Sequence, residues 1–209
     1  MNKITIPAII FFILTISCFS QEKSYVQTAY NALKSGNYEA AITNYSKSIE
    51  IYDKYAPAFY GRGMAYYYTG SFQQAILDFD RALELDPKLT NAIYARGLAY
   101  AQISEYSNSI RDLSEFLKSD QKNSDAYYAR GNVYYFLQED EYALADYNQA
   151  INIKPDYGLA YYGRALIYKF AKKNDDALRN FDKYIELSAN KDNLLDEVQR
   201  LIKEITEQE

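Results

Sequence analysis

Four arginines recur at one spacing and are the side chains best suited to hold an anion. They are spaced 34 residues apart: Arg62, Arg96, Arg130 and Arg164. A row of guanidinium groups could bind phosphate or carboxylate through paired hydrogen bonds. The residues sixteen positions further on indicate another role: they are Asp78, Asp112, Asp146 and Asn180. The arginines therefore have potential partners within the chain.

The acid occurs only where the arginine does. In the preceding stretch of 34 residues, Thr28 replaces the arginine and Asn44 stands sixteen positions later. A partly buried charge has to be matched by an opposite charge. We therefore expect structural ion pairs and not an anion site. The expected pairs are Arg62–Asp78, Arg96–Asp112 and Arg130–Asp146.

The sequence has few of the residue types that catalysis and metal binding usually require. The chain has no His, and its single Cys is Cys18. This removes the commonest general base, the usual metal ligands and any disulfide within the chain. An active site made only of carboxylates stays formally open, but no pair of them is marked out. We expect no metal site, no cofactor and no enzymatic activity.

The amino-acid composition excludes further classes of protein. Of the 209 residues, 48% are apolar and only 12 are Gly or Pro (8 and 4), which argues against disorder. The net charge is −5 and no segment concentrates Lys or Arg, so we expect no nucleic-acid binding. The 24 Tyr and 10 Phe suit half-buried helix surfaces.

Residues 1–20 differ from the rest and resemble an export signal. Lys3 precedes an apolar run from Ile4 to Ile16, which is short for a membrane span. One interpretation is a secretory signal cut between Ser20 and Gln21. A second is lipidation of Cys18, and a third is an uncleaved anchor. All three export the body of the protein, so we expect it in the periplasm or cell envelope, with membrane contact only through this segment.

The arginine spacing is shared by other residues, which indicates an internal repeat. Tyrosines follow it at Tyr60, Tyr94, Tyr128 and Tyr162. Small residues follow it at Gly63, Gly97 and Gly131, and at Ala41, Ala75, Ala143 and Ala177. The clearest copy is AFYGRGMAYYYTGSFQQAILDFDRALELDP, residues 58–87. This pattern resembles the tetratricopeptide repeat (TPR).

The resemblance implies an all-α, right-handed solenoid of five helical hairpins. The frame gives a divergent repeat 1 at 22–55, followed by repeats 2 to 5 at 56–89, 90–123, 124–157 and 158–191. In repeat 2 we expect helices at about 57–69 and 73–85. Segment 192–209 should form a capping helix from about Leu194 to Ile205, with Glu197 and Glu204 among its water-facing residues.

The turn glycine of the repeat is Gly36 in repeat 1 and Gly70 in repeat 2. Repeats 3 to 5 have Ser104, Gln138 and Lys172 in its place. Because residues with a side chain rarely adopt the left-handed conformation, we expect these three turns to be more tightly bonded or frayed.

In TPR proteins the first helices line a concave groove, and the resemblance assigns these residues to it: Tyr60, Tyr67, Tyr68, Tyr94, Tyr128, Asn132, Tyr135, Phe136, Tyr162 and Phe170. Tyr is frequent in most of these columns of the family, so those rings can equally be generic scaffold. Tyr68, Phe136 and Phe170 stand in a column that is more often polar. They are the better candidates for ligand contact.

The expected function is an exported scaffold that binds a protein or extended peptide of unknown identity, in an unknown oligomeric state. A carbohydrate-binding surface is the alternative, because stacked tyrosine rings also bind sugars.

Overall fold

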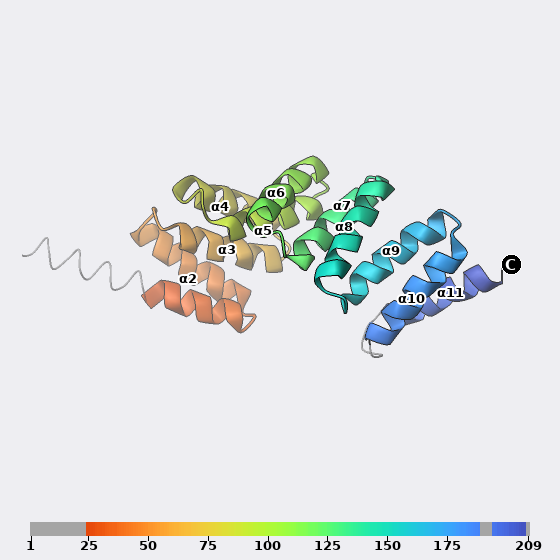
Figure 1. Ribbon diagram of the computed structural model, residues 1–209. Coiled ribbons are helices and arrows are strands. Elements are labelled where there is room, and N and C mark those ends of the chain that lie inside the picture. The colour runs from red at the N-terminus through yellow and green to blue at the C-terminus, as the bar shows by residue number, and fades with distance from the viewer. Residues whose placement is uncertain (1–23, 189–193, 208–209) are drawn as a thin grey trace, which may run out of the picture. The chain divides into compact units, whose positions relative to one another are not determined.

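The computed structural model describes residues 24–188 and 194–207 (Figure 1). The predicted signal segment and Cys18 lie outside these residues. Every regular element in the described ranges is a helix, as the repeat predicts. None of these helices combines the length and apolar character needed to cross a membrane.

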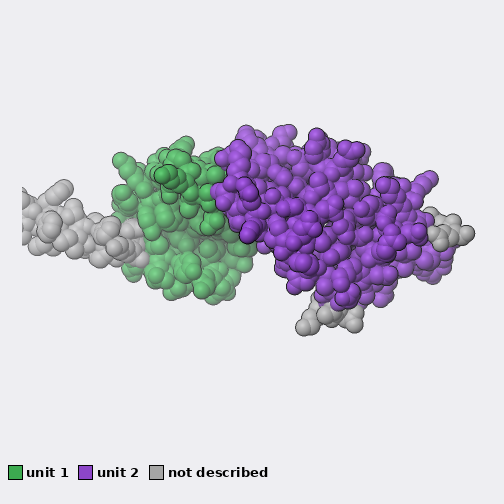
Figure 2. Space-filling model, viewed as in Figure 1, with its two compact units in different colours: residues 1–105 green, residues 106–209 purple. Residues whose placement is uncertain are grey.

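The chain divides into two compact units, residues 1–105 and 106–209 (Figure 2). Unit 1 contains a helix over residues 24–34, followed by α2 (Tyr38–Ile51), α3 (Ala56–Tyr68), α4 (Phe72–Leu85) and α5 (Thr90–Gln102). Unit 2 contains α6 (Tyr106–Ser119), α7 (Ser124–Phe136), α8 (Asp140–Ile153), α9 (Gly158–Phe170), α10 (Asn174–Ser188) and α11 (Leu195–Thr206). The division falls inside repeat 3, between its two helices. The helix bounds agree with the expected ones to within about one residue.

Proline and asparagine fix several of the helix ends. Asp86 and Lys154 precede prolines and have extended backbone, with φ of −138° and −130°, so α4 and α8 end there. Asn37 and Asn123 accept a backbone hydrogen bond at the start of α2 and α7, which satisfies a free helix N–H. Local sequence therefore sets where these helices begin and end.

The turn inside each hairpin is the same with or without glycine. Gly70 has φ 76°, and Gln138 has φ 59°. The Gly70 N–H donates to Tyr67 O at 3.1 Å, and the Gln138 N–H donates to Tyr135 O at 2.9 Å. Ser104 and Lys172 are also left-handed, at 61° and 55°. None of the three substituted turns is frayed, since each keeps the left-handed residue and the hydrogen bond that the glycine turns have.

A column of large side chains on the second helices fills the interior. Its members are all nearly or fully buried: Tyr45, Phe79, Leu113, Tyr147 and Phe181. The ring of Tyr147 lies across two glycines of neighbouring first helices. A Cβ at Gly131 would be 2.9 Å from its Cε1, and a Cβ at Gly163 would be 2.7 Å from its Cζ. The small residues thus let the rings pack directly on the first-helix backbone.

The last helix covers the end of unit 2, as expected for a cap. Val198 and Ile205 of α11 are 0% and 3% exposed and pack in one cluster with Phe181 and Tyr184 of α10. Leu201 and Ile202 are half-buried against the same cluster. The aliphatic stripe of α11 therefore shields interior rings from water.

Candidate interaction surface of the first helices

The arginines hold helices together. In unit 2, Arg130 Nε and Nη2 donate to the two oxygens of Asp146 at 2.8 and 2.7 Å, while Nη1 donates to Ser114 Oγ at 2.9 Å. The pair is mostly buried, and the hydrogen bond to Asp146 raises the pKa of Arg130 further. With its guanidinium shared among α6, α7 and α8, Arg130 is committed to structure.

Two other arginines repeat this bridge. Arg62 donates to both Asp78 oxygens at 2.8 Å and to Ser46 Oγ at 3.0 Å, and its pKa is raised by the Asp78 hydrogen bond. Arg164 Nε donates to Asn180 Oδ1 at 2.7 Å, and its Nη1 to Asn148 Oδ1 at 2.6 Å. The pairs Arg62–Asp78 and Arg130–Asp146 are thus present.

The second partner of each arginine was missed by the sequence analysis. It stands sixteen residues before the arginine, and a signal for it exists, since these positions are polar at the 34-residue spacing: Ser46, Asp80, Ser114 and Asn148. Each first helix packs against the preceding second helix, and only this packing brings the column within reach of the arginines.

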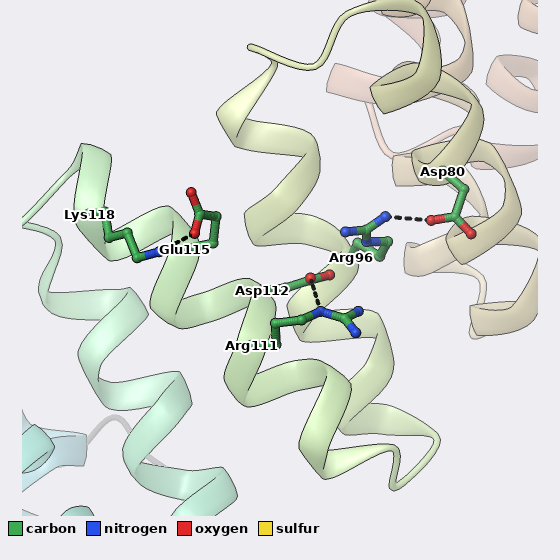
Figure 3. Close-up of polar contacts among 6 residues, drawn as sticks. All are labelled: Asp80, Arg96, Arg111, Asp112, Glu115 and Lys118. Atoms are coloured by element: carbon green, nitrogen blue, oxygen red, sulfur yellow. Dashed lines mark hydrogen bonds and ion pairs between the residues drawn. The ribbon is translucent and has the colours of Figure 1, made fainter.

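Arg96 has a partner that the sequence analysis did not predict. Its Nη1 donates to Asp80 Oδ1 at 2.5 Å, which is the partner sixteen residues before it (Figure 3). Asp112 Oδ1 lies 3.4 Å from Arg111 Nε, its sequence neighbour. The expected Arg96–Asp112 contact stays a prediction.

Most of the predicted groove tyrosines are half-buried and pack on the interior. Tyr60 lies 6.0 Å from Phe79, measured between ring centroids, and Tyr67 lies 5.5 Å from Phe72. Burial raises the pKa of both hydroxyls. Tyr94 and Tyr135 are also half-buried. These rings stabilise the hairpins, whatever else they contact.

The same holds in unit 2. Tyr128 lies 6.0 Å from Tyr147, and the Tyr147 hydroxyl donates to Asn132 Oδ1 at 2.8 Å. Asn132 therefore satisfies a buried hydroxyl. Tyr162 packs on Phe181 and donates to Glu197 Oε1 at 3.1 Å. Burial first and the Glu197 charge second raise the pKa of Tyr162 to about 12.

The capping helix α11 also contacts the first helix α9 through polar groups. Besides the Tyr162–Glu197 bond, Lys169 Nζ of α9 lies 3.0 Å from Glu204 Oε2 of α11. Both glutamates were expected to face water, and both instead contact α9. The reason is that α11 occupies the place of a sixth first helix, so one side of it lies against the preceding first helix.

Three rings differ from the others in being exposed. Tyr68, Phe136 and Phe170 are 52%, 64% and 82% accessible, and each is the last residue of a first helix. An apolar side chain at such exposure loses the free energy that burial would provide. These three residues were the better candidates from the sequence, and their accessibility suits contact with a ligand.

Two of the exposed rings rest on another ring. Tyr68 stacks on Tyr38 with centroids 5.0 Å apart and planes 18° apart, and Phe136 stacks on Tyr106 at 6.0 Å and 5°. The supporting ring stands 30 residues earlier, at the start of a second helix. For Phe170 that position is Asp140.

Unit 2 has two pockets beside these residues. A pocket of about 580 Å³ lies among α7, α9 and α11, and its lining includes Tyr135, Leu166, Lys169, Leu201 and Ile205. A smaller pocket of about 250 Å³ is lined by Tyr135, Phe136, Gln138, Asp140 and Phe170. Tyr135 and Phe170 line both, so the two pockets are neighbours. No group of His, Cys, Asp and Glu in the described ranges could hold a metal ion.

Known structures share this fold. A crystal structure of the MamA protein is 26% identical, with a TM-score of 0.73 over 82% of this chain and 93% of that one. MamA residues 41-end from Desulfovibrio magneticus RS-1 is 21% identical, with a TM-score of 0.76 over 83% and 98%. YrrB, described as a TPR protein with an unusual peptide-binding site, is 20% identical, with a TM-score of 0.68 over 79% and 86%. No curated protein matches in sequence.

Three family models of the repeat match the sequence. Tetratricopeptide repeat models match residues 56–89 and 94–158, and a TPR repeat model matches 32–70. The first match has the bounds expected for repeat 2. Proteins of this kind are typically non-catalytic scaffolds for protein–protein interaction, and that coarse function is supported here. The matches, the helical hairpins and the shared fold identify this chain as a member of the tetratricopeptide repeat family.

Proposed function

We propose that this chain is an exported scaffold that binds an extended segment of a partner protein on the surface of its first helices. The observation that carries the proposal is the exposure of three aromatic rings at equivalent helix ends, Tyr68, Phe136 and Phe170. Rigid exposed rings give large contact area at low entropic cost, so they are typical anchors of interfaces.

The pockets of unit 2 add a place for the partner. The larger pocket, of about 580 Å³, is lined by Phe170, and the smaller one, of about 250 Å³, is lined by Phe136 and Phe170. YrrB has a peptide-binding site by its description, and it shares the fold. At 20% identity that likeness concerns the fold alone, so the proposal rests on the exposed rings and the pockets of this chain.

Crosslinking in living cells tests the binding surface. A photoreactive p-benzoylphenylalanine is placed at position 136, where Phe136 is exposed on a first helix. The matched control carries it at position 142, where Tyr142 is 61% exposed on the second helix α8. We expect a discrete crosslinked protein at position 136 and none at 142. Equal products at both positions, or none at either, would contradict the proposal.

A glycan array with the purified protein decides against the carbohydrate alternative. The proposal expects no glycan signal that depends on Tyr68. Binding to a glycan that disappears in Tyr68→Ala, together with no crosslinked protein, would replace the proposal by its alternative.

Export is tested by the intact mass of the protein recovered from cells. The proposal expects either a chain that starts at Gln21 or an acylated chain that starts at Cys18. A Cys18→Ser variant distinguishes them, because it blocks lipidation and leaves the apolar run unchanged. A full-length chain in the cytoplasm would contradict the export part and leave the binding part to the crosslinking experiment.

A further inference from the structure

The smaller pocket of unit 2 has a carboxylate where the other two exposed rings have a supporting tyrosine. Phe170 has no ring contact with another described residue, and Asp140 occupies the place where Tyr38 and Tyr106 support Tyr68 and Phe136. Asp140 is the first residue of α8, and its carboxylate has no hydrogen bond or ion pair within the described part of the chain. The pocket thus joins two exposed rings to one unmatched carboxylate.

We infer that this pocket takes a basic side chain, and arginine before lysine, from the extended segment that the proposed function requires. The inference rests on that function and names the partner's chemistry. A guanidinium is attracted by the faces of aromatic rings and stacks on them, while a carboxylate pairs with its charge. Phe136 and Phe170 supply the rings, and Asp140 supplies the charge.

The surroundings favour a cation. Glu139 and Glu141 flank Asp140, so the start of α8 is acidic. Two lysines, Lys169 and Lys172, line the larger pocket and not the smaller one, and Lys169 is already paired with Glu204. An acidic partner side chain would meet repulsion at Asp140.

The larger pocket indicates which side chain of the partner segment would lie next to the basic one. Its walls join the apolar Leu166, Leu201 and Ile205 to the polar Lys169, Lys172 and Asn174, so an aliphatic side chain can pack against the apolar wall. Since Phe170 and Tyr135 line both pockets, we infer that the segment places a basic and an aliphatic side chain on either side of Phe170.

Peptide binding to the whole chain tests this assignment. The probes are three fluorescein-labelled peptides of sequence Ser-Pro-Leu-X-Leu-Pro-Ser, in which X is arginine, methionine or glutamate, and binding is measured by fluorescence anisotropy. We expect the arginine peptide to bind at least about fivefold more tightly than the methionine peptide, and the glutamate peptide to bind most weakly.

Variants locate the effect. Asp140→Asn should reduce affinity for the arginine peptide about three- to tenfold and leave the methionine peptide unchanged. Phe170→Leu should weaken the arginine peptide more than the methionine peptide, because it removes an aromatic face. The matched controls are Glu141→Gln and Tyr142→Leu, an adjacent carboxylate and an exposed ring that do not line the pocket. They should bind all three peptides as the native chain does.

The outcomes separate this inference from the proposed function. Equal affinity for the three peptides, no binding of any of them, or a loss in Asp140→Asn no larger than in Glu141→Gln overturns the basic-side-chain inference. The proposed function then still stands if position 136 crosslinks a partner protein, and fails with it if it does not.

Discussion

Aromatic rings occupy two regions of this protein and have opposite surroundings. Tyr147 and Phe181 of the second helices are 1% and 0% exposed, whereas Phe136 and Phe170 at the ends of first helices are 64% and 82% exposed. The interior rings press on glycine and alanine of neighbouring helices. The difference teaches that the repeat fixes a ring's position, while the presence of a covering helix decides whether the ring stabilises the fold or is free to contact another molecule.

Removal of the cap should have the largest effect, because it converts interior rings into exposed ones. A chain that ends at residue 189 lacks Val198 and Ile205, which contribute about 3–6 kcal/mol before entropy, and it uncovers Phe181 and Tyr184. We expect aggregation and a lower melting temperature, measured by light scattering after size exclusion and by circular dichroism. A chain that ends at residue 207 is the control. A soluble truncated chain with unchanged melting would remove the capping role of α11.

The next largest effect on stability is expected from the mostly buried arginine–aspartate pairs. Arg130→Leu leaves Asp146 nearly buried without its partner, so we expect a loss of about 3–5 kcal/mol in the free energy of unfolding by urea. Adding Asp146→Leu should recover at least about 1 kcal/mol.

The exposed pair Arg179–Asp176 is the control for this cycle and should show a coupling below about 1 kcal/mol. Additive losses in the Arg130 cycle would count against a mutual contact. The same cycle on Arg96 and Asp112, with Arg96 and Asp80 for comparison, tests the third pair that the sequence predicts.

A smaller loss of stability is expected where a ring of a second helix packs on a glycine of a first helix. Gly163→Ala places a Cβ 2.7 Å from Tyr147 Cζ, so we expect a loss of about 1–3 kcal/mol. At Gly158 the nearest atom to a new Cβ is 3.6 Å away, so Gly158→Ala is a matched control expected near neutral. Thermal unfolding followed by circular dichroism compares them. Equal losses in the two variants would show that helix propensity, and not the ring, decides.

The smallest effect on stability is expected at the exposed rings. Phe170→Ala should change the free energy of unfolding by no more than about 0.5 kcal/mol, because the ring has little burial to lose. Phe181→Ala is the matched interior variant, with an expected loss of about 3–5 kcal/mol. Urea unfolding measures both. A loss above about 1 kcal/mol in Phe170→Ala would place this ring with the interior and weaken its assignment to an interface.

Repetition explains why so much of the fold could be predicted. A 34-residue spacing carried by Arg62, Tyr60 and Gly63 in several copies fixes the phase, and prolines such as Pro87 mark where helices end. The helix bounds, the cap and the pairs Arg62–Asp78 and Arg130–Asp146 follow from that phase. The contact of Arg96 with Asp80 and the polar contacts of α11 with α9 could not be predicted, because both depend on which helices of neighbouring repeats meet.

The sequence by itself determined the order of the helices and the columns of like residues, since these are properties of local spacing. The resemblance to the repeat family singled out Tyr68, Phe136 and Phe170, because their column is more often polar in that family. Tertiary structure alone decided three other features. It holds Ser104, Gln138 and Lys172 in a left-handed turn, because the packing of two helices outweighs a cost of about 1–2 kcal/mol per residue. It gives each arginine a second partner on the preceding hairpin. It also leaves Phe170 beside the unmatched Asp140, because accessibility depends on which neighbouring helices are present to cover a side chain.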